Sequence, residues 1–133
     1  MLRTLTLCLI TALPVQAMEG SPLSGAAFAE RVTGKTIYFE QYGRAYGAET
    51  YRGDGSVTWR FSGEECREGR WYAEGDAICF VYEYAPNEPQ CWHFFDAPEG
   101  LVGRVVGADP LDDLTGRRES PAPLICDQPY LGA

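Results

Sequence analysis

The segment from residue 66 to residue 95 constrains the fold more than any other part of this sequence. It places three of the chain's five cysteines in a segment rich in aromatic residues, parts of which alternate with a period of two. A period of two is typical of a β-strand, because successive side chains point to opposite faces. Residues 78–84 divide in this way into Ile78, Phe80, Tyr82 and Tyr84 on one face and Cys79, Val81 and Glu83 on the other. The segment therefore predicts a small β-domain held together by disulfides.

Residues 1–17 are typical of an export signal. Arg3 supplies the positive charge, residues 5–13 are apolar, and Val15 and Ala17 are the small residues expected before cleavage at Met18. A short membrane anchor is the alternative, but the apolar run is only about ten residues where a span needs about 20. We expect a signal peptide at 1–17 and a periplasmic or secreted protein. Residues 18–133 would form one β-rich domain with an irregular tail from about residue 108.

Four cysteines remain once Cys8 leaves with the leader, namely Cys66, Cys79, Cys91 and Cys126. An even number in a small exported domain indicates a disulfide framework. Zinc binding is the rival interpretation, but the chain has no C-x-x-C pair and a single histidine. Three pairings are possible, and we favour Cys79 with Cys91 and Cys66 with Cys126. A tight loop that pairs Tyr84 with Gln90 would put the first pair out of register, so the pairing stays open.

The pattern of residues predicts a mainly β fold with one short N-terminal helix. Residues 24–33 read as the helix, with Ser24 as its cap and Gly34 at its end. About seven strands follow, joined by short turns such as Asp54-Gly55, which favours an antiparallel up-and-down meander. We expect a small barrel or a strongly curved sheet, with strands at 36–39, 46–52, 56–61, 67–73, 78–84, 90–95 and 101–106.

The chain is acidic, with 19 Asp and Glu residues against 11 Lys and Arg residues. This sign of charge argues against nucleic-acid binding, which needs cations to contact phosphate. Residues 71–103 contain no Lys or Arg but hold six carboxylates, at Glu74, Asp76, Glu83, Glu88, Asp96 and Glu99. Attraction to a cationic periplasmic protein or another envelope component is one interpretation. A solvated acidic surface with no partner is the other.

Dense aromatic side chains supply the candidate binding residues. Large rings recur along the predicted strands, and they either fill the interior or line a ligand pocket. For His93, which lies between two aromatic residues, a structural role is the alternative to binding. The five candidates for binding are Trp59, Trp71, Tyr82, Trp92 and His93.

Catalytic and metal-binding patterns are weak in this sequence. A serine triad would have to use His93, and there is no G-x-S-x-G turn. The acidic group of Asp109, Asp112 and Asp113 lacks the spacing of a calcium loop. No glycine-rich turn leads from a strand into a helix, as dinucleotide binding requires. We therefore expect no catalytic residue, no metal and no cofactor.

Four motifs carry a resemblance to a known family: YGAETYRGDGSVTWRF, ECREGRWY, ICFVYE and PQCWHFF. Over roughly residues 33–107 the chain resembles small exported proteins of alphaproteobacteria, some of which are named dihydrodipicolinate reductase. The resemblance implies an exported β-domain, and the residues do not support the reductase name. Gly69-Arg70-Trp71 is similar to the G-x-W of lipocalins. The helix followed by a meander is similar to small barrel inhibitors of proteases.

Three functions therefore compete at this point. The first is an exported, monomeric, non-enzymatic domain that binds a macromolecular partner in the cell envelope. The second is a carrier of a small apolar ligand with a lipocalin-like cavity. The third is an enzyme, suggested only by the family name. A filled interior would favour the first function, and an open apolar cavity would favour the second.

Overall fold

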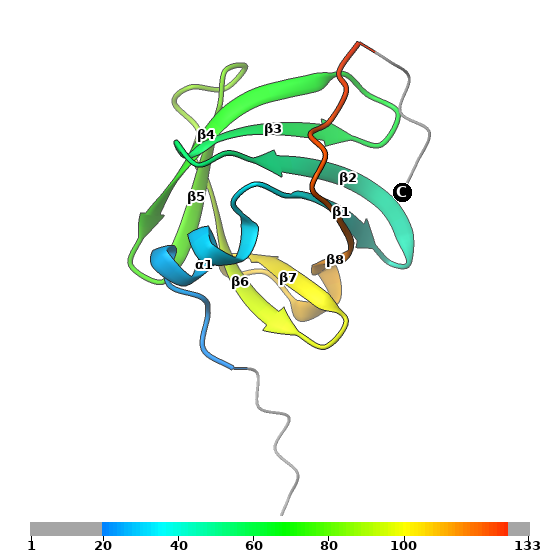
Figure 1. Cartoon of the computed structure of the whole chain (residues 1–133). Coiled ribbons are helices and arrows are strands. Elements are labelled where there is room, and N and C mark those ends of the chain that lie inside the picture. The colour runs from blue at the N-terminus through cyan, green and yellow to red at the C-terminus, as the bar shows by residue number, and fades with distance from the viewer. Residues whose placement is uncertain (1–19, 128–133) are drawn as a thin grey trace, which may run out of the picture.

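The computed structural model describes residues 20–127 of the 133-residue chain. The predicted signal peptide at 1–17 and the cleavage point at Met18 lie outside the described residues. The domain itself is a closed barrel in which each strand pairs antiparallel with the next and β1 pairs with β8 (Figure 1). Its strands are β1 (Thr36–Gln41), β2 (Arg44–Tyr51), β3 (Ser56–Phe61), β4 (Cys66–Glu74), β5 (Ala77–Tyr82), β6 (Gln90–Ala97), β7 (Gly100–Val105) and β8 (Leu114–Ser120).

This architecture confirms the predicted helix and meander and decides between the two predicted shapes. The sheet closes, so neither β1 nor β8 is left as an unpaired edge. The number of strands was predicted one too low, because β8 lies in the region from residue 108 that we expected to be irregular. Its core-facing residues include Gly116, whose Cβ would lie 2.5 Å from Ile37 Cγ2. A glycine gives no apolar signal, so the alternation of β8 is hidden in the sequence.

The helix α1 (Gly25–Val32) closes one end of the barrel. The Ser24 hydroxyl caps it by accepting a bond from the Ala27 N–H at 3.1 Å. Phe28 and Val32 are fully buried, and the Phe28 ring contacts aromatic rings from β2, β4, β5 and β6. We call this the closed end. Within residues 20–127, no helix has the length and apolar character needed to cross a membrane.

The structure contains two disulfides, in the pairing that the sequence favoured. Cys79 on β5 lies directly opposite Cys91 on β6, with their Cα atoms 4.0 Å apart. The register therefore follows the looser closure of the loop at residues 83–89. Cys66 at the start of β4 is bonded to Cys126, with a Cα–Cα distance of 5.6 Å.

The segment after β8 crosses the outside of the barrel before it reaches Cys126. Figure 1 shows this segment in orange and red, passing over β1, β2 and β3. The Ala122 carbonyl accepts a bond from the Thr36 hydroxyl, and the Leu124 N–H donates to Thr50 Oγ1. Arg60 donates to the Ile125 carbonyl. The tail therefore buries an outward-facing row of polar residues.

Candidate functional site

A pocket lies inside the barrel at the end opposite α1, which we call the open end. Its volume is about 50 Å³. Phe61, Gln90 and Leu114, which line it, are the last residue of β3 and the first residues of β6 and β8. The remaining lining is mostly aromatic and comprises Phe39, Tyr46, Glu49, Tyr51, Trp59, Phe80, Tyr82, Tyr84, Trp92 and Phe94.

Two groups of rings line this pocket. On β2 and β3, Tyr46, Trp59 and Phe61 contact one another with ring centroids 5.2–5.9 Å apart. On the β5 side, Tyr82 and Tyr84 stack at 5.8 Å. Offset and edge-to-face contacts of this kind stabilise aromatic clusters beyond simple burial. The walls are therefore held in place by ring packing as well as by the strands.

A buried carboxylate, Glu49, lies in this aromatic lining. Its side chain is only 3 % exposed, and the Tyr82 hydroxyl donates to Glu49 Oε2 at 2.5 Å. Burial disfavours the charged form and raises the pKa of Glu49 to about 7, although the hydrogen bond from Tyr82 and the nearby Tyr51 hydroxyl oppose the shift. Burial and the Glu49 charge together raise the pKa of Tyr51 and of Tyr82. The Glu49 side chain can therefore be either neutral or negatively charged near neutral pH.

Two further polar groups of the pocket lining have incomplete hydrogen bonding. Trp59 Nε1 and the Tyr51 hydroxyl are buried and lack a hydrogen-bond partner of good geometry among residues 20–127. The Tyr51 hydroxyl nevertheless lies near enough to Glu49 for each group to influence the pKa of the other. Buried polar groups of this kind are uncommon, and each unsatisfied group has a cost in free energy. They show that the lining is polar enough to accept an occupant that forms hydrogen bonds.

Local irregularities in β2 allow this arrangement. Phe39 pairs with Gly47 but Glu40 pairs with Ala45, so Tyr46 is the extra residue of a β-bulge. A bulge redirects a side chain. Tyr46 and Glu49 are three residues apart and would point to opposite faces of a regular strand, but the bulge lets both line the pocket. Gly47 is needed because a Cβ there would lie 2.5 Å from the Trp59 ring.

The structure brings together three of the five candidate binding residues. Trp59, Tyr82 and Trp92 line the pocket. Trp71 instead packs against Phe28 at the closed end, with ring centroids 5.1 Å apart, so its role is in the core. His93 lies on the opposite face of β6 from Trp92, and its Nε2 is 3.2 Å from Asp76 Oδ1. Neither Trp71 nor His93 belongs to the site.

Sequence reasoning missed Glu49 and Tyr46. The sequence does hold an indication for Glu49. It lies two residues before the buried Tyr51, so both side chains point to the same face of β2, and that face is otherwise apolar. A carboxylate at such a position is unusual unless it has a partner or a function. No comparable signal existed for Tyr46, because the bulge depends on pairing between β1 and β2.

The acidic stretch at 71–103 does not form one surface. The meander sends Glu74, Asp76, Asp96 and Glu99 toward the closed end and Glu83 and Glu88 into an open-end loop. The four open-end loops, at 42–43, 62–65, 83–89 and 106–113, together contain seven carboxylates and no Lys or Arg. The closed-end loops, at 33–35, 52–55, 75–76 and 98–99, contain three carboxylates and two basic residues. The open-end loops are therefore more acidic than the closed-end loops, although Arg44, Arg67 and Arg104 lie in the strand ends next to them.

A positively charged side chain also lies at the open end, over an aromatic ring. The Arg67 guanidinium lies 5.3 Å from the centroid of the Tyr84 ring. Asp113 in the last loop is paired with Arg104 through bonds of 2.7 and 2.8 Å. The other six loop carboxylates form none of the ion pairs found between described residues.

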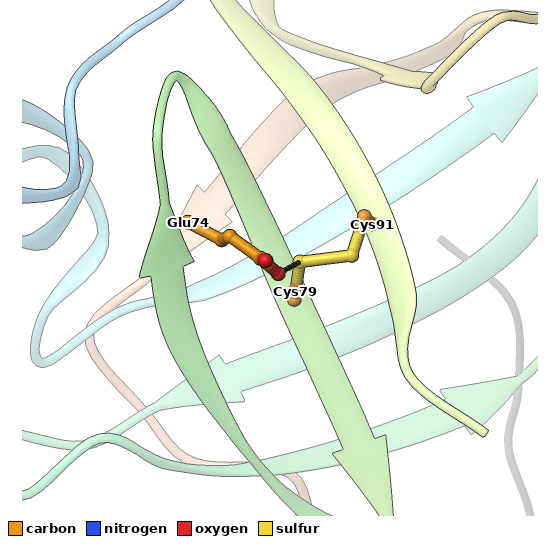
Figure 2. Close-up of side chains that lie close together, drawn as sticks. All are labelled: Glu74, Cys79 and Cys91. Atoms are coloured by element: carbon orange, nitrogen blue, oxygen red, sulfur yellow. Dashed lines mark hydrogen bonds between the residues drawn. A yellow bond between two sulfur atoms is a disulfide. The ribbon is translucent and has the colours of Figure 1, made fainter.

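Glu74, Cys79 and Cys91 gather on the outside of the barrel near the closed end. Figure 2 shows Glu74 directed at the disulfide that joins β5 and β6. The three potential ligand atoms lie within 4.8 Å of one another. Metal binding by cysteine requires a thiolate, and the disulfide leaves neither sulfur in that form. In the oxidised protein this group is a covalent link between strands.

Comparisons with known proteins give no match: no family model, no curated protein and no solved structure matches this chain. The resemblance to exported alphaproteobacterial proteins therefore stays a prediction. The geometry of the open end carries the functional argument.

Proposed function

We propose that this chain is an exported, non-enzymatic β-domain that acts as a monomer and binds a cationic protein of the cell envelope. The observation that carries the proposal is the charge of the open-end loops, which contain seven carboxylates and no basic residue and lie at the same end of the barrel as the aromatic pocket. A surface of one sign attracts a partner of the opposite sign and increases the rate of association. Aromatic side chains near the centre of an interface supply much of the binding free energy.

Export is supported by two features. The two disulfides are consistent with an oxidising extracytoplasmic location. Residues 1–17 have the charge, apolar run and small residues of a secretory signal. Sequencing the N-terminus of the native protein should give Met18, and an intact Met1 on the exported protein would contradict this part of the proposal.

The alternative of a small-ligand carrier has less support. Pockets for drug-sized ligands usually measure about 300–1,000 Å³, whereas the pocket here is about 50 Å³. The rest of the interior is filled by a continuous cluster of buried side chains that includes Phe28, Ile37 and Phe80. A ligand of lipocalin type would need this core to open.

Affinity capture with two matched variants tests the proposal. The open-end variant replaces Glu65, Glu83 and Glu88 with Gln, and the control variant replaces Glu30, Glu74 and Glu99 with Gln. All six residues are exposed, and both variants change the net charge equally. Each mature protein would be used as bait in a periplasmic extract, with bound proteins identified by mass spectrometry.

We expect the wild-type and control proteins to capture the same basic protein and the open-end variant to lose most of it. Capture should also weaken as salt is raised, because exposed charges are screened beyond about 10 Å at 0.1 M salt. Equal capture by both variants, or capture of a protein without basic character, would contradict the proposal.

A further inference from the structure

The pocket of the open end has the chemistry of a receptor for a positively charged group. Glu49 is buried in its lining, where the Tyr82 hydroxyl donates to it and the Tyr51 hydroxyl lies close enough to lower its pKa. No cation among residues 20–127 contributes to its pKa shift. Tyr82 occupies Oε2 of this carboxylate. The second carboxylate oxygen, which has two lone pairs, can accept a hydrogen bond from a donor that enters from the mouth even with the Tyr51 hydroxyl nearby.

The walls of the pocket favour the same occupant. Aromatic faces attract cations, and the attraction increases when the cation is removed from water. The pairing of Arg67 with the Tyr84 ring is an example of this interaction within the chain. The loops around the mouth add negative potential from carboxylates such as Glu65, Glu83 and Glu88.

Size limits what can enter. A volume of about 50 Å³ has room for roughly three or four water-sized groups, since each needs about 10–15 Å³. A guanidinium or a terminal aminomethyl group is of this size, and a whole metabolite is larger. The occupant is therefore the tip of a longer molecule whose remainder lies outside the barrel.

We propose that the pocket receives the tip of a lysine or arginine side chain of the protein partner, which pairs with Glu49 and lies against the rings of Tyr46, Trp59 and Tyr84. This inference rests on the proposed function, because it names the group by which the cationic partner is recognised. The Tyr51 hydroxyl would gain a donor from the entering cation. Loop carboxylates would guide the approach of the partner, and Glu49 would hold it after docking.

Small probes test the pocket without the partner. We would titrate the mature protein with n-butylammonium, n-butylguanidinium and the neutral n-butanol, and follow the tryptophan indole signals by two-dimensional NMR. The cations should bind in the low millimolar range at pH 8, with shifts at Trp59 and Trp92, and n-butanol should bind at least tenfold more weakly. Equal binding of the alcohol would overturn the inference, because the pocket would then be simply apolar.

Variants and pH identify the carboxylate responsible. Glu49→Gln keeps the shape of the side chain and should weaken binding of the cations at least tenfold, whereas Glu74→Gln at the closed end should leave it unchanged. If Glu49→Gln does not fold, the wild-type protein provides the same test, with cation binding at least fivefold weaker at pH 5.5 than at pH 8. Tyr51 and Tyr82 are the titratable groups that act on Glu49, and both stay neutral over this range. If cation binding is unaffected by both the Glu49→Gln substitution and the change of pH, the inference is overturned.

Two peptides distinguish a side chain from a free amine. Acetyl-Ala-Lys-Ala-amide should bind like n-butylammonium, and the same peptide with norleucine in place of lysine should not. If the free amine binds but the lysine peptide is excluded, the pocket serves a small amine and the inference is wrong.

Kinetics with the captured partner separate this inference from the proposed function. Glu49→Gln should increase the dissociation rate about tenfold with little change in association rate, while the open-end variant should mainly slow association. If only the open-end variant has an effect, the proposed function stands and the pocket inference falls. If the probes bind but no cationic protein is captured, the proposed function fails.

Discussion

At the scale of single residues, Glu49 is the group whose chemistry depends most on the fold. The same side chain would be an ordinary acid in the unfolded chain, where its pKa is 4.5, and burial raises the pKa to about 7. Between these values the folded protein binds more protons than the unfolded chain. Folding stability therefore falls as the pH rises through this window.

Replacing Glu49 with Gln should remove this dependence. A rise of this size corresponds to roughly 3 kcal/mol, so the variant should be more stable than wild type by up to that amount at pH 8. At about pH 3, well below both pKa values, the carboxyl is protonated in both states and the two should differ little. Urea denaturation at the two pH values measures this. A variant destabilised by the same amount at both would mean that Glu49 acts only through packing.

Gly47 offers a second residue-level test. A methyl group there would lie 2.5 Å from Trp59 Cζ2 and 2.7 Å from the Arg60 carbonyl oxygen. Gly47→Ala should cost about 1–3 kcal/mol by overpacking and should alter the near-ultraviolet circular dichroism of the tryptophans. Gly20→Ala is the control, since nothing lies within 4 Å of its added methyl group. Equal stability of the two variants would show that the Trp59 wall moves freely.

At the scale of elements, the two disulfides differ in the length of chain that they close. Cys66–Cys126 closes a sequence separation of 60 residues and holds the tail across β1, β2 and β3, whereas Cys79–Cys91 closes a separation of 12 within one hairpin. A longer closed loop removes more entropy from the unfolded chain. The tail link should therefore contribute more to stability even though it joins the periphery.

Paired serine variants test this ranking. Removing Cys66 and Cys126 should cost roughly 4 kcal/mol, and removing Cys79 and Cys91 roughly 3 kcal/mol, by the loop-entropy relation. Only the first variant should also speed amide exchange at Leu124, whose N–H donates to Thr50. Denaturation and hydrogen exchange measure the two effects. A greater loss from the hairpin pair would show that burial of Cys79 matters more than loop closure.

At the scale of the whole molecule, the barrel has two unlike ends. α1 fills the closed end with Phe28 and Val32, while the open end keeps a small aromatic pocket surrounded by carboxylates. A meander produces this separation because alternate loops fall at the same end. Charges that are scattered along the sequence thus collect in one place.

The same topology predicts no dinucleotide chemistry. Among residues 20–127, α1 is the single α-helix, it precedes the first strand, and every strand pair is antiparallel. Pyrophosphate is usually held at a helix N-terminus that follows a parallel strand. Calorimetric titration with NADH and NADPH should show no saturable binding. A micromolar dissociation constant with one-to-one stoichiometry would contradict this prediction.

Local signals in the sequence determined the fold class, the helix and seven of the strands, and they favoured the observed cysteine pairing without excluding the others. Each depends on neighbours in the chain: Ser24 caps its own helix, Asp54 and Gly55 form their own turn, and the alternation at 78–82 needs no distant partner. Tertiary structure alone decided the rest. Closure required β8 to pair with β1, the bulge at Tyr46 arose from the pairing of β1 with β2, and Glu49 met Tyr82 across a sequence separation of 33 residues. The physical reason is that a pocket is made by side chains from many strands, and no stretch of sequence records which of them will face one another.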